Sequence, residues 1–350
     1  MGNNSLNRLA WDRFKKNKLS LSALIFIIGC FFVAIFALFF SPDKSRMAND
    51  MNLETAMKSP LETVYFLEIP IDYYTKKSTF KDFFLGKLEP VDRIPLSSYN
   101  IIDGGIDYFI YGTNQKQQYI GNYEIYKRVF WLGSDKYGRD LLSRIIHGLR
   151  VSLSVGSISV IISLIIGVIL GLLAGYFRGI TDDVIMWLVN VIWSIPTLLM
   201  VIAITLALGK GFWQLFIAIG LTMWVEVARV VRGQVLVIRE LEYIEAGKVL
   251  AYKSWRIILK HIMPNVIAPV IVISVANFSS AILIESGLSF LGIGVQPPLA
   301  SLGGIIKDHY TYIIMDKAYL AIFPGLVIVF IVLSFMIFGN GLRDAFDVKH

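Results

Sequence analysis

The chain has 350 residues, of which 55% are hydrophobic and only 17% are charged. A soluble domain of this length needs more polar surface, so the composition excludes a soluble globular protein and predicts one that sits in a lipid bilayer. The net charge of +7 does not indicate nucleic-acid binding, because the basic residues lie at the ends of apolar segments and not along one face.

Six segments without charged residues predict an all-α polytopic membrane protein with six transmembrane helices. Five of them have 20 or more residues, enough to cross about 30 Å of hydrocarbon at about 1.5 Å per residue. The fourth is shorter, but Glu226 at its end can reach the membrane interface. In chain order the segments are 19–40, 151–177, 184–209, 211–225, 265–284 and 318–341.

The first segment follows a basic N-terminus, as a signal peptide would. Its apolar core is longer than that of a signal and no small-x-small cleavage site follows, so we expect it to remain as an anchor. If successive helices cross the membrane in opposite directions, the segments on the side of the N-terminus hold 15 Lys and Arg. The short loops on the other side hold three. By the positive-inside rule, both termini are expected in the cytoplasm.

The segment 41–130 is therefore expected outside the cell membrane. Its stretch "NIIDGGIDYFIYG" (100–112) predicts a β-hairpin, with Asp103, Gly104 and Gly105 supplying the positive φ angles of a tight turn. We expect a small, partly β insertion there, and an irregular tether is the open alternative.

Several residues in the membrane segments predict how the helices pack. Gly167, Gly171, Gly175 and Gly179 recur every four residues and predict a close helix approach, either within the chain or against a second subunit. Pro196 predicts a kink, which is a static bend or a gating hinge. Polar residues in the apolar segments form helix–helix hydrogen bonds or line a pathway; the candidates for lining are Asn190, Asn277 and Ser280.

The stretch "EYIEAGKVLAYKSWRIILKHIMPN" (242–265) is a polar, amphipathic insert between apolar segments, on the predicted cytoplasmic side. We expect Ser254 to cap a second short helix and Pro264 to start the next membrane helix. Ala246, Gly247 and Ala251 have small side chains and leave one side of this insert uncovered, as in a helix on which another protein packs closely. The alternative is a connector that lies on the lipid surface.

This stretch resembles the cytoplasmic "EAA" loop of ABC-transporter permeases of the dipeptide and oligopeptide importers. "WLGSDKYGRDLLSRIIHGLRVSLSVG" (131–156) resembles their Leu-Gly-Thr-Asp-x-x-Gly-Arg-Asp signature, with Ser134 in place of Thr. "LSFLGIGVQPP" (288–298) and "FPGLVIVFIVLSFMIFGNGLRDAFD" (323–347) are similar to the last two membrane segments of the family. The anchor is similar to that of the second-permease type. The likeness covers about 8–40 and 130–348.

The resemblance implies a type-1 ABC importer permease fold in a bacterial inner membrane. The parts are a cytoplasmic N-terminus with its anchor (1–40), the extracytoplasmic insertion (41–130) and the permease domain (131–348) with its coupling loop (233–264). The implied partners are a homologous permease subunit, two ABC ATPase subunits that carry ATP and Mg, and an extracytoplasmic substrate-binding protein. No cofactor or metal is expected on this chain itself.

The resemblance also implies two functional sets of residues. An ATPase groove would hold the coupling loop through Tyr243, Glu245, Ala246, Gly247, Leu250 and Ala251. An outer lip near the docking surface of the binding protein would be formed by Gly133, Asp135, Gly138, Arg139 and Asp140. For Arg139 and Asp140 an ion pair or helix cap at the helix entry is the alternative.

The sequence departs from the family pattern at a few positions. Gly247 replaces the second Ala of Glu-Ala-Ala, and Ala251 stands where a glycine is expected. If that position is left-handed, Ala251 adds about 1 kcal/mol of strain. Asn340 and Leu302 stand where the family has Asp and Trp.

Two observations bear on the energy source. No G-x-x-x-x-G-K-[ST] motif is present, so the chain has no usual cradle for a triphosphate. The predicted helices lack central charges; Glu226 and Glu285 lie at their ends. We therefore expect a transport subunit driven by a partner. The alternatives are a secondary carrier or channel, and a membrane enzyme, for which no nucleophile–base or metal set is found.

Overall fold

A computed structural model describes residues 6–70, 91–113, 115–209 and 211–346 of the chain. The chain folds as two compact units. The first comprises residues 1–30, 152–295 and 328–350, and the second comprises residues 31–151 and 296–327. Helices α2, α5 and α13 contribute residues to both units.

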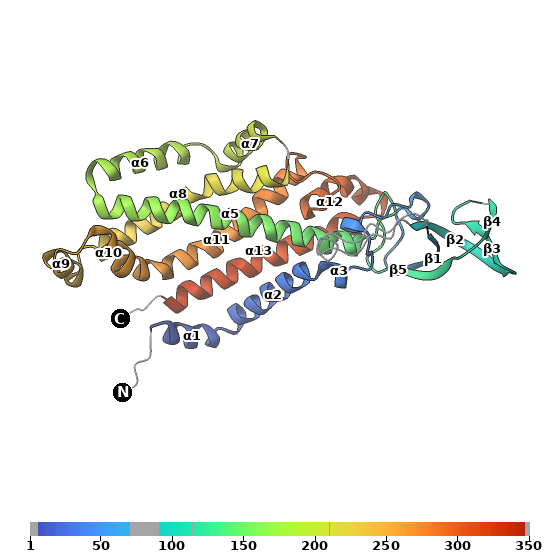
Figure 1. The fold of residues 1–350 in the computed structure, drawn as a ribbon, viewed down its shortest axis with the longest axis horizontal. Helices are drawn as coiled ribbons and strands as arrows, with labels where there is room; N and C mark the ends of the chain where they lie inside the picture. The colour runs from blue at the N-terminus through green and yellow to red at the C-terminus, as the bar shows by residue number, and fades with distance from the viewer. Residues whose placement is uncertain (1–5, 71–90, 114, 210, 347–350) are drawn as a thin grey trace. The chain divides into compact units, whose positions relative to one another are not determined.

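The first unit is built from helices (Figure 1). They are α1 (Leu6–Lys16), α2 (Lys18–Ile35), α5 (Leu141–Phe177), α6 (Gly179–Trp193), α7 (Thr197–Leu208), α8 (Phe212–Ile238), α9 (Glu242–Val249), α10 (Ser254–Ile257), a π-helical turn (Ile258–Ile262), α11 (Met263–Phe290) and α13 (Tyr319–Phe346). Within the described residues, five helices are long and apolar enough to cross a membrane, and the bent pair α6–α7 makes a sixth crossing if it counts as one span. The prediction of six spans is confirmed in that form.

The predicted kink at Pro196 is a complete break. Helices α6 and α7 meet at 91° on either side of residues 194–196 (Figure 1). Proline has no N–H to continue the helix, and its ring disfavours helical backbone in the preceding residue. The third predicted segment is thus two short helices.

The glycine stripe packs within the chain. A Cβ at Gly167 would lie 2.5 Å from the Val227 Cβ, and one at Gly171 would lie 2.7 Å from the Ala228 carbonyl oxygen. Gly175 stands equally close to Val235, whereas nothing lies within 4 Å of a Cβ at Gly179. Of the two alternatives, the contact of α5 with α8 therefore accounts for three of the four glycines.

Two predictions about charged residues are wrong. Helix α8 continues to Ile238, so Glu226 lies inside the helix and not at its end. The helix continues because Val227, Val231 and Val235 keep an apolar stripe buried beneath its charged face. Glu285 is fully buried in α11. Its carboxylate accepts hydrogen bonds from the Ser152, Ser286 and Ser289 hydroxyls, at 2.6, 3.4 and 2.8 Å, which replace the water it loses.

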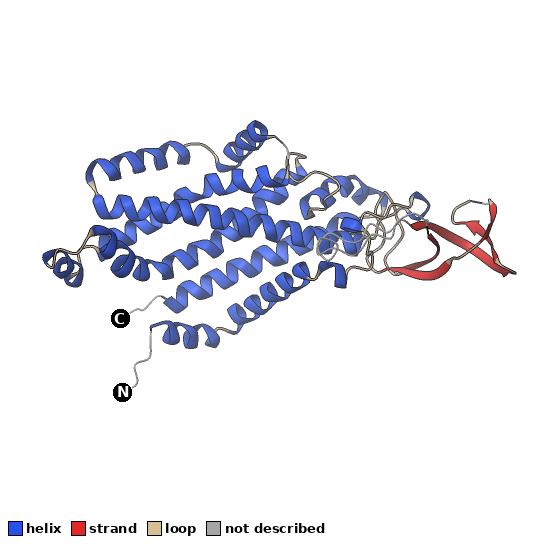
Figure 2. Cartoon of the chain, viewed as in Figure 1, coloured by secondary structure: helices blue, strands red, loops and turns tan. Residues whose placement is uncertain are grey.

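The second unit contains an antiparallel five-stranded sheet in the order β4-β3-β2-β1-β5 (Figure 2). The strands are β1 (Glu62–Pro70), β2 (Val91–Ile102), β3 (Gly105–Ile110), β4 (Lys116–Ile120) and β5 (Glu124–Phe130). The predicted hairpin is the β2–β3 pair, which closes at Ile102 and Gly105; of its three turn residues, Gly104 alone has a positive φ, of 75°. A sheet of this size favours the subdomain over the irregular tether. Residues 71–90 of the predicted insertion lie outside the described residues.

The remaining elements of the second unit are short. They are α3 (Ala37–Phe40), α12 (Leu302–His309) and three 3₁₀ segments (Arg46–Ala48, Leu53–Thr55 and Tyr310–Met315). Because α2 ends at Ile35 and α3 begins at Ala37, the first predicted segment is interrupted at Phe36. The core of the sheet contains Leu67, Leu96, Ile106 and Tyr108 on one side.

Candidate functional site

The predicted coupling loop forms two short helices between α8 and α11 (Figure 1). Helix α9 ends in a Schellman motif, because the Tyr252 N–H donates to the Gly247 carbonyl at 3.0 Å and the Ala251 N–H donates to the Lys248 carbonyl at 2.9 Å. Ala251 has a φ of 53°. The left-handed position is therefore confirmed, and an alanine occupies it.

The second helix of the loop starts differently from the prediction. Ser254 is its first helical residue, and Lys253, with a ψ of 141°, occupies the cap position without a side-chain hydrogen bond. The predicted Ser254 cap is wrong because a capping residue needs the extended backbone that Lys253 has. Pro264 lies in the first turn of α11, as expected. Helix α10, the π-helical turn and α11 follow one another without a break.

An apolar seam fixes the loop to the helix bundle. Ile244 from α9 and Ile257, Ile258 and Ile262 from the second half of the loop are each 1% exposed or less. They belong to one cluster of buried side chains with Val235 and Ile238 of α8 and other residues of the bundle. Burying each side chain of this size stabilises the contact by about 1.5–3 kcal/mol. The loop is thus built to move together with α8 and α11.

Polar contacts hold the neighbouring helix ends. Arg232 of α8 makes two hydrogen bonds to the Asp182 carboxylate of α6, at 2.5 and 2.6 Å. Arg239 donates to the Tyr176 carbonyl of α5 at 2.5 Å. A bidentate arginine–carboxylate pair fixes direction as well as distance. The end of α8 that carries the loop is therefore tied to both neighbouring helices.

The surface of the loop carries exposed apolar side chains. Tyr243 is 47%, Leu250 66% and Val249 86% exposed. Glu245, Ala246 and Ala251 are also exposed. Gly247 is buried, and a Cβ there would lie 3.5 Å from the Tyr252 ring. Five of the six predicted contact residues thus face outward, and Gly247 faces the second helix of the loop.

Val249 did not figure in the prediction, although it is the most exposed apolar residue of α9. The signal in the sequence was its position beside Leu250 at the end of a helix whose other apolar residue, Ile244, is buried. Two adjacent aliphatic side chains in water are unusual for a free surface and favour a protein contact.

The predicted pathway residues do not form one group. Ser280 lines a pocket of about 200 Å³ below the α6–α7 break, together with Glu226, Thr222 and Trp193. Asn277 is buried, and its Nδ2 has no hydrogen-bond partner among the described residues. Asn190 is exposed on α6 and does not line this pocket. A pathway role stays a prediction, and the pocket adds Glu226 to the candidates.

The predicted outer motif is buried in the second unit and lies at the start of α5. Asp135 Oδ1 accepts the Arg139 N–H at 3.0 Å, and its Oδ2 forms an ion pair with Arg139 Nε at 2.6 Å. Asp140 caps α5 by accepting the Ser143 N–H at 2.7 Å. The helix cap that we gave as an alternative is present at Asp140, and Arg139 forms its ion pair with Asp135.

The two glycines of the motif allow chain segments to approach. Gly133 has a φ of 88°, and a Cβ there would lie 2.5 Å from the Lys58 carbonyl oxygen. Gly138 has a φ of 75°, and its Cβ would overlap the Asn52 carbonyl. All five motif residues are buried, so they fasten the insertion to the helix entry and do not themselves form an exposed lip.

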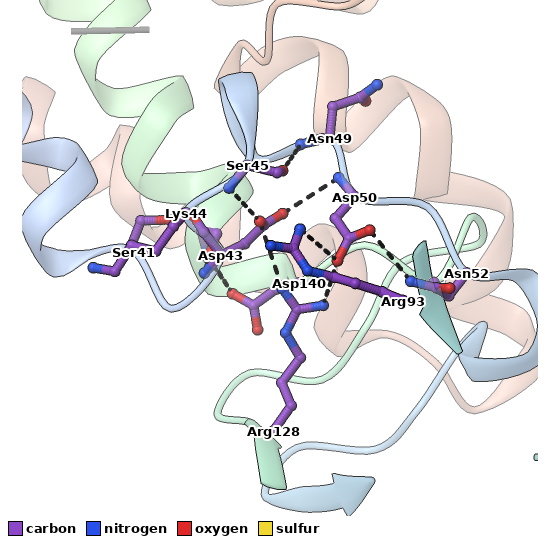
Figure 3. A network of polar contacts seen from close by, with 12 residues as sticks. Ser41, Asp43, Lys44, Ser45, Asn49, Asp50, Asn52, Arg93, Arg128 and Asp140 are labelled. Atoms are coloured by element: carbon purple, nitrogen blue, oxygen red, sulfur yellow. Dashed lines mark hydrogen bonds and ion pairs between the residues drawn. The ribbon is translucent and has the colours of Figure 1, made fainter. Parts of the chain in front are cut away.

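A charged network lies beside the outer motif, and the sequence analysis did not predict it (Figure 3). Arg128 of β5 lies 3.0 Å from the Asp50 carboxylate and 3.5 Å from that of Asp43, and Arg93 of β2 also pairs with Asp50. Burial disfavours the charge of Arg128, but the two carboxylates outweigh this, and the pKa of Arg128 is raised. The network joins two strands to the chain that follows α3.

Comparisons with known proteins agree with these features. A family model described as the binding-protein-dependent transport system inner membrane component matches residues 167–349. Another, the N-terminal TM domain of oligopeptide transport permease C, matches residues 5–60. The dipeptide transport system permease protein DppC of Lactococcus lactis subsp. cremoris is 33% identical over 340 residues, which cover 97% of this chain and 90% of that protein.

Two further relatives match a shorter part. The protein DppC of Bacillus subtilis is 40% identical over 219 residues, 63% of this chain and 68% of its own length. The glutathione transport system permease protein GsiD of Pectobacterium atrosepticum is 38% identical over 219 residues, 63% of this chain and 72% of its own length. Among solved structures, an inward-facing MetNI methionine ABC transporter is similar with 18% identity and a TM-score of 0.49, over 60% of this chain and 98% of that chain.

Proposed function

Because the chain belongs to the family of binding-protein-dependent transport system inner membrane components, we propose that it forms half of the translocation pathway of an ATP-driven importer for di- or oligopeptides. Relatives named as dipeptide, oligopeptide and glutathione permease proteins support a peptide substrate. The other half would come from a homologous permease subunit. Two ATPase subunits would bind ATP and Mg, and an extracytoplasmic binding protein would deliver the peptide.

The observation that carries the proposal is the construction of the coupling loop. Its inner face is buried against α8 and its outer face presents Tyr243, Val249 and Leu250. A partner that pushes on this surface would displace α8 and α11 together with the loop, because Ile244 and Ile257 are buried in one apolar cluster with residues of these helices. Such a lever transmits force that this chain does not generate.

The arrangement of the chain ends supports a bacterial inner-membrane protein with both termini in the cytoplasm. Within the first unit, Phe14 of α1 packs with Ala345 near the end of α13. Pro264, which directly follows the coupling loop, lines a cavity with residues of both helices. The N-terminal helix, the end of the last helix and the loop thus lie at the same end of the bundle, as the positive-inside rule requires.

One argument against the secondary carrier, the lack of charged residues inside the helices, no longer holds. A buried Glu285 and a mid-helix Glu226 are groups that an ion-coupled carrier could use. Family membership now favours the ATP-driven importer instead. Uptake by the purified chain without any ATPase subunit, coupled to an ion gradient, would support the carrier.

The coupling loop is tested by a pair of exposed substitutions. Val249→Asp with Leu250→Asp should weaken binding of the ATPase subunits by about 30-fold or more, because two apolar contacts would be replaced by buried charges. Co-purification of the ATPase and ATP-driven peptide uptake in proteoliposomes measure this. Gly247→Trp is a poorer test, since it would disturb the packing against Tyr252 inside the loop.

Ile120→Asp is the matched control, because Ile120 is 72% exposed on the sheet of the second unit. This variant should keep its ATPase partners. Full ATPase binding and peptide uptake by the Val249→Asp/Leu250→Asp variant would refute the proposed coupling role of the loop.

A further inference from the structure

An apolar cavity of about 390 Å³ opens between α1, the start of α11 and the end of α13. Its volume falls in the range of roughly 300–1,000 Å³ that is usual for small-molecule pockets. Every lining side chain is apolar; they are Ala10, Trp11, Phe14, Pro264, Ile267, Ala268, Ile271, Leu342, Ala345 and Phe346. The proposed transport cycle uses none of them. The cavity therefore calls for an apolar occupant.

The shape of the cavity suits a hydrocarbon chain. Its wall on α11 consists of positions 264, 267, 268 and 271, which lie on one face of the helix. Seven residues of helix extend about 10 Å. The cavity thus follows the first two turns of α11 and the last turns of α13, both of which belong to candidate membrane spans. An acyl chain from the adjoining bilayer would continue along this wall.

The helix that forms one wall of the cavity, α1, is basic. Helix α1 buries Ala10 and Phe14 on one face and exposes Arg13, Lys15 and Lys16 on the other. Its eleven residues contain four cations and one acid. A short amphipathic helix of this kind lies in the interface of a bilayer and attracts anionic headgroups.

Two more side chains fit the same level of a membrane. Trp11 is 45% exposed, stacks on Phe14 and lies under the Lys15 ammonium group, 5.1 Å from its ring centre. Indole rings collect at the headgroup level of bilayers. Lys260 is exposed one helical turn before Pro264. Cations are thus carried by two of the elements that form the cavity, and Asp12, Asp344 and Asp347 are the nearest acids in the sequence.

We propose that this cavity binds one anionic glycerophospholipid, with an acyl chain between α1, α11 and α13 and the phosphate beside Lys15, Lys16 and Lys260. The lipid would fix α1 against the end of α13 and against α11, which directly continues the coupling loop. A protein partner is less suited, since the cavity is lined by residues of two candidate membrane spans and Lys15 and Lys260 lie within four residues of its lining in the sequence.

Native mass spectrometry of the complete transporter in detergent tests the site, with phosphatidylglycerol and phosphatidylcholine as probes. We expect one phosphatidylglycerol to bind saturably and phosphatidylcholine to bind at least tenfold more weakly. Ala268→Trp should abolish the bound lipid by filling the cavity. Ala276→Trp is the matched control, because Ala276 is exposed two turns further along the same helix and does not line the cavity.

Surface variants keep the test valid if Ala268→Trp does not fold. Lys15→Gln with Lys16→Gln should weaken phosphatidylglycerol binding by about 25-fold, since each interfacial cation contributes roughly fivefold. Lys248→Gln with Lys253→Gln, on the coupling loop, should leave it unchanged. Equal binding of both lipids, or retention of the lipid in Ala268→Trp, would overturn the proposal. So would a lipid that binds the isolated permease but not the complete transporter, because a partner subunit would then fill the cavity.

Discussion

Ala251 carries a local strain that a single substitution can remove. The residue holds a φ of 53° at the end of α9, a conformation that costs a non-glycine residue about 1 kcal/mol or more. Ala251→Gly should therefore stabilise the protein by about 1 kcal/mol and raise the unfolding midpoint of the purified protein by roughly 2 °C. Ala246→Gly, inside the same helix, should destabilise it by about 0.5–1 kcal/mol. A loss of stability in both variants would contradict the Schellman geometry.

Asp140 gives the helix entry a dependence on pH. Burial raises the pKa of this carboxyl above its ordinary value of 3.8, although hydrogen bonds from Ser143 oppose the rise. A group whose pKa is raised by folding contributes stability that is fully present below its unfolded pKa and is lost as pH rises through its folded pKa. Asp140→Asn keeps an acceptor for the Ser143 N–H but does not titrate.

The stability of the natural protein relative to Asp140→Asn should therefore fall as the pH rises from about 4 toward neutrality. Unfolding midpoints of both proteins at several pH values measure this difference. Asp140→Ala serves as a second comparison, because it removes the cap and should cost about 0.5–2 kcal/mol at every pH. A difference that does not change with pH would show that Asp140 keeps an ordinary pKa.

At the level of the helices, the close contact of α5 with α8 depends on the absence of side chains. A Cβ at Gly171 would lie 2.7 Å from both the Ala228 carbonyl oxygen and the Val231 Cβ. Gly171→Val should destabilise the protein by about 1–3 kcal/mol through overpacking. Gly233→Ala, on α8 with nothing within 4 Å, should be neutral or slightly stabilising. Yields of folded protein and unfolding midpoints in detergent would show whether the two glycines differ.

Features with a local physical cause were predictable from the sequence. The glycine stripe, the break at Pro196 and the β2–β3 turn each depend on the backbone properties of one or two residues. The end of α8 was not predictable from a charge count, because its apolar stripe continues beneath Arg229 and Arg232. The pairing of Arg128 with Asp50 joins residues 78 positions apart, and no spacing rule reports such a contact.

The same limit applies to the candidate site. The exposed face of the coupling loop was predictable because small and apolar residues alternate with charges within one short segment. The inward direction of Gly247 depends on Tyr252 and Ile257 folding back over it, which the sequence of α9 alone does not reveal. The apolar cavity was not predicted either, since α1, α11 and α13 bring together three distant parts of the chain.

For the whole molecule, we predict that the sheet of the second unit offers a surface for the proposed binding protein. Tyr65 and Tyr99 have their ring centres 5.9 Å apart, and Ile101 lies two residues beyond Tyr99 on the same face of β2. These side chains are 42%, 36% and 72% exposed. Exposed aromatic and aliphatic side chains in one patch are typical of protein interfaces.

Tyr99→Ser with Ile101→Asp should weaken binding of the extracytoplasmic protein by about tenfold or more while ATPase binding persists, because the patch is remote in sequence from the coupling loop. Ile120→Asp is the control on the opposite face. Ile101 pairs with Ile106, and Ile106 pairs with Tyr119, so these three side chains share one face of the sheet. Ile120 follows Tyr119 in β4 and therefore points to the other face. Titration of the binding protein onto the purified transporter, followed by stimulated ATP hydrolysis, measures both variants. Deletion of the whole insertion would not test this face alone, because Asp43, Asp50 and Arg128 of the insertion also hold the start of α5 (Figure 3). Equal affinity in the two variants would exclude this face and direct the search to the loop between α11 and α13.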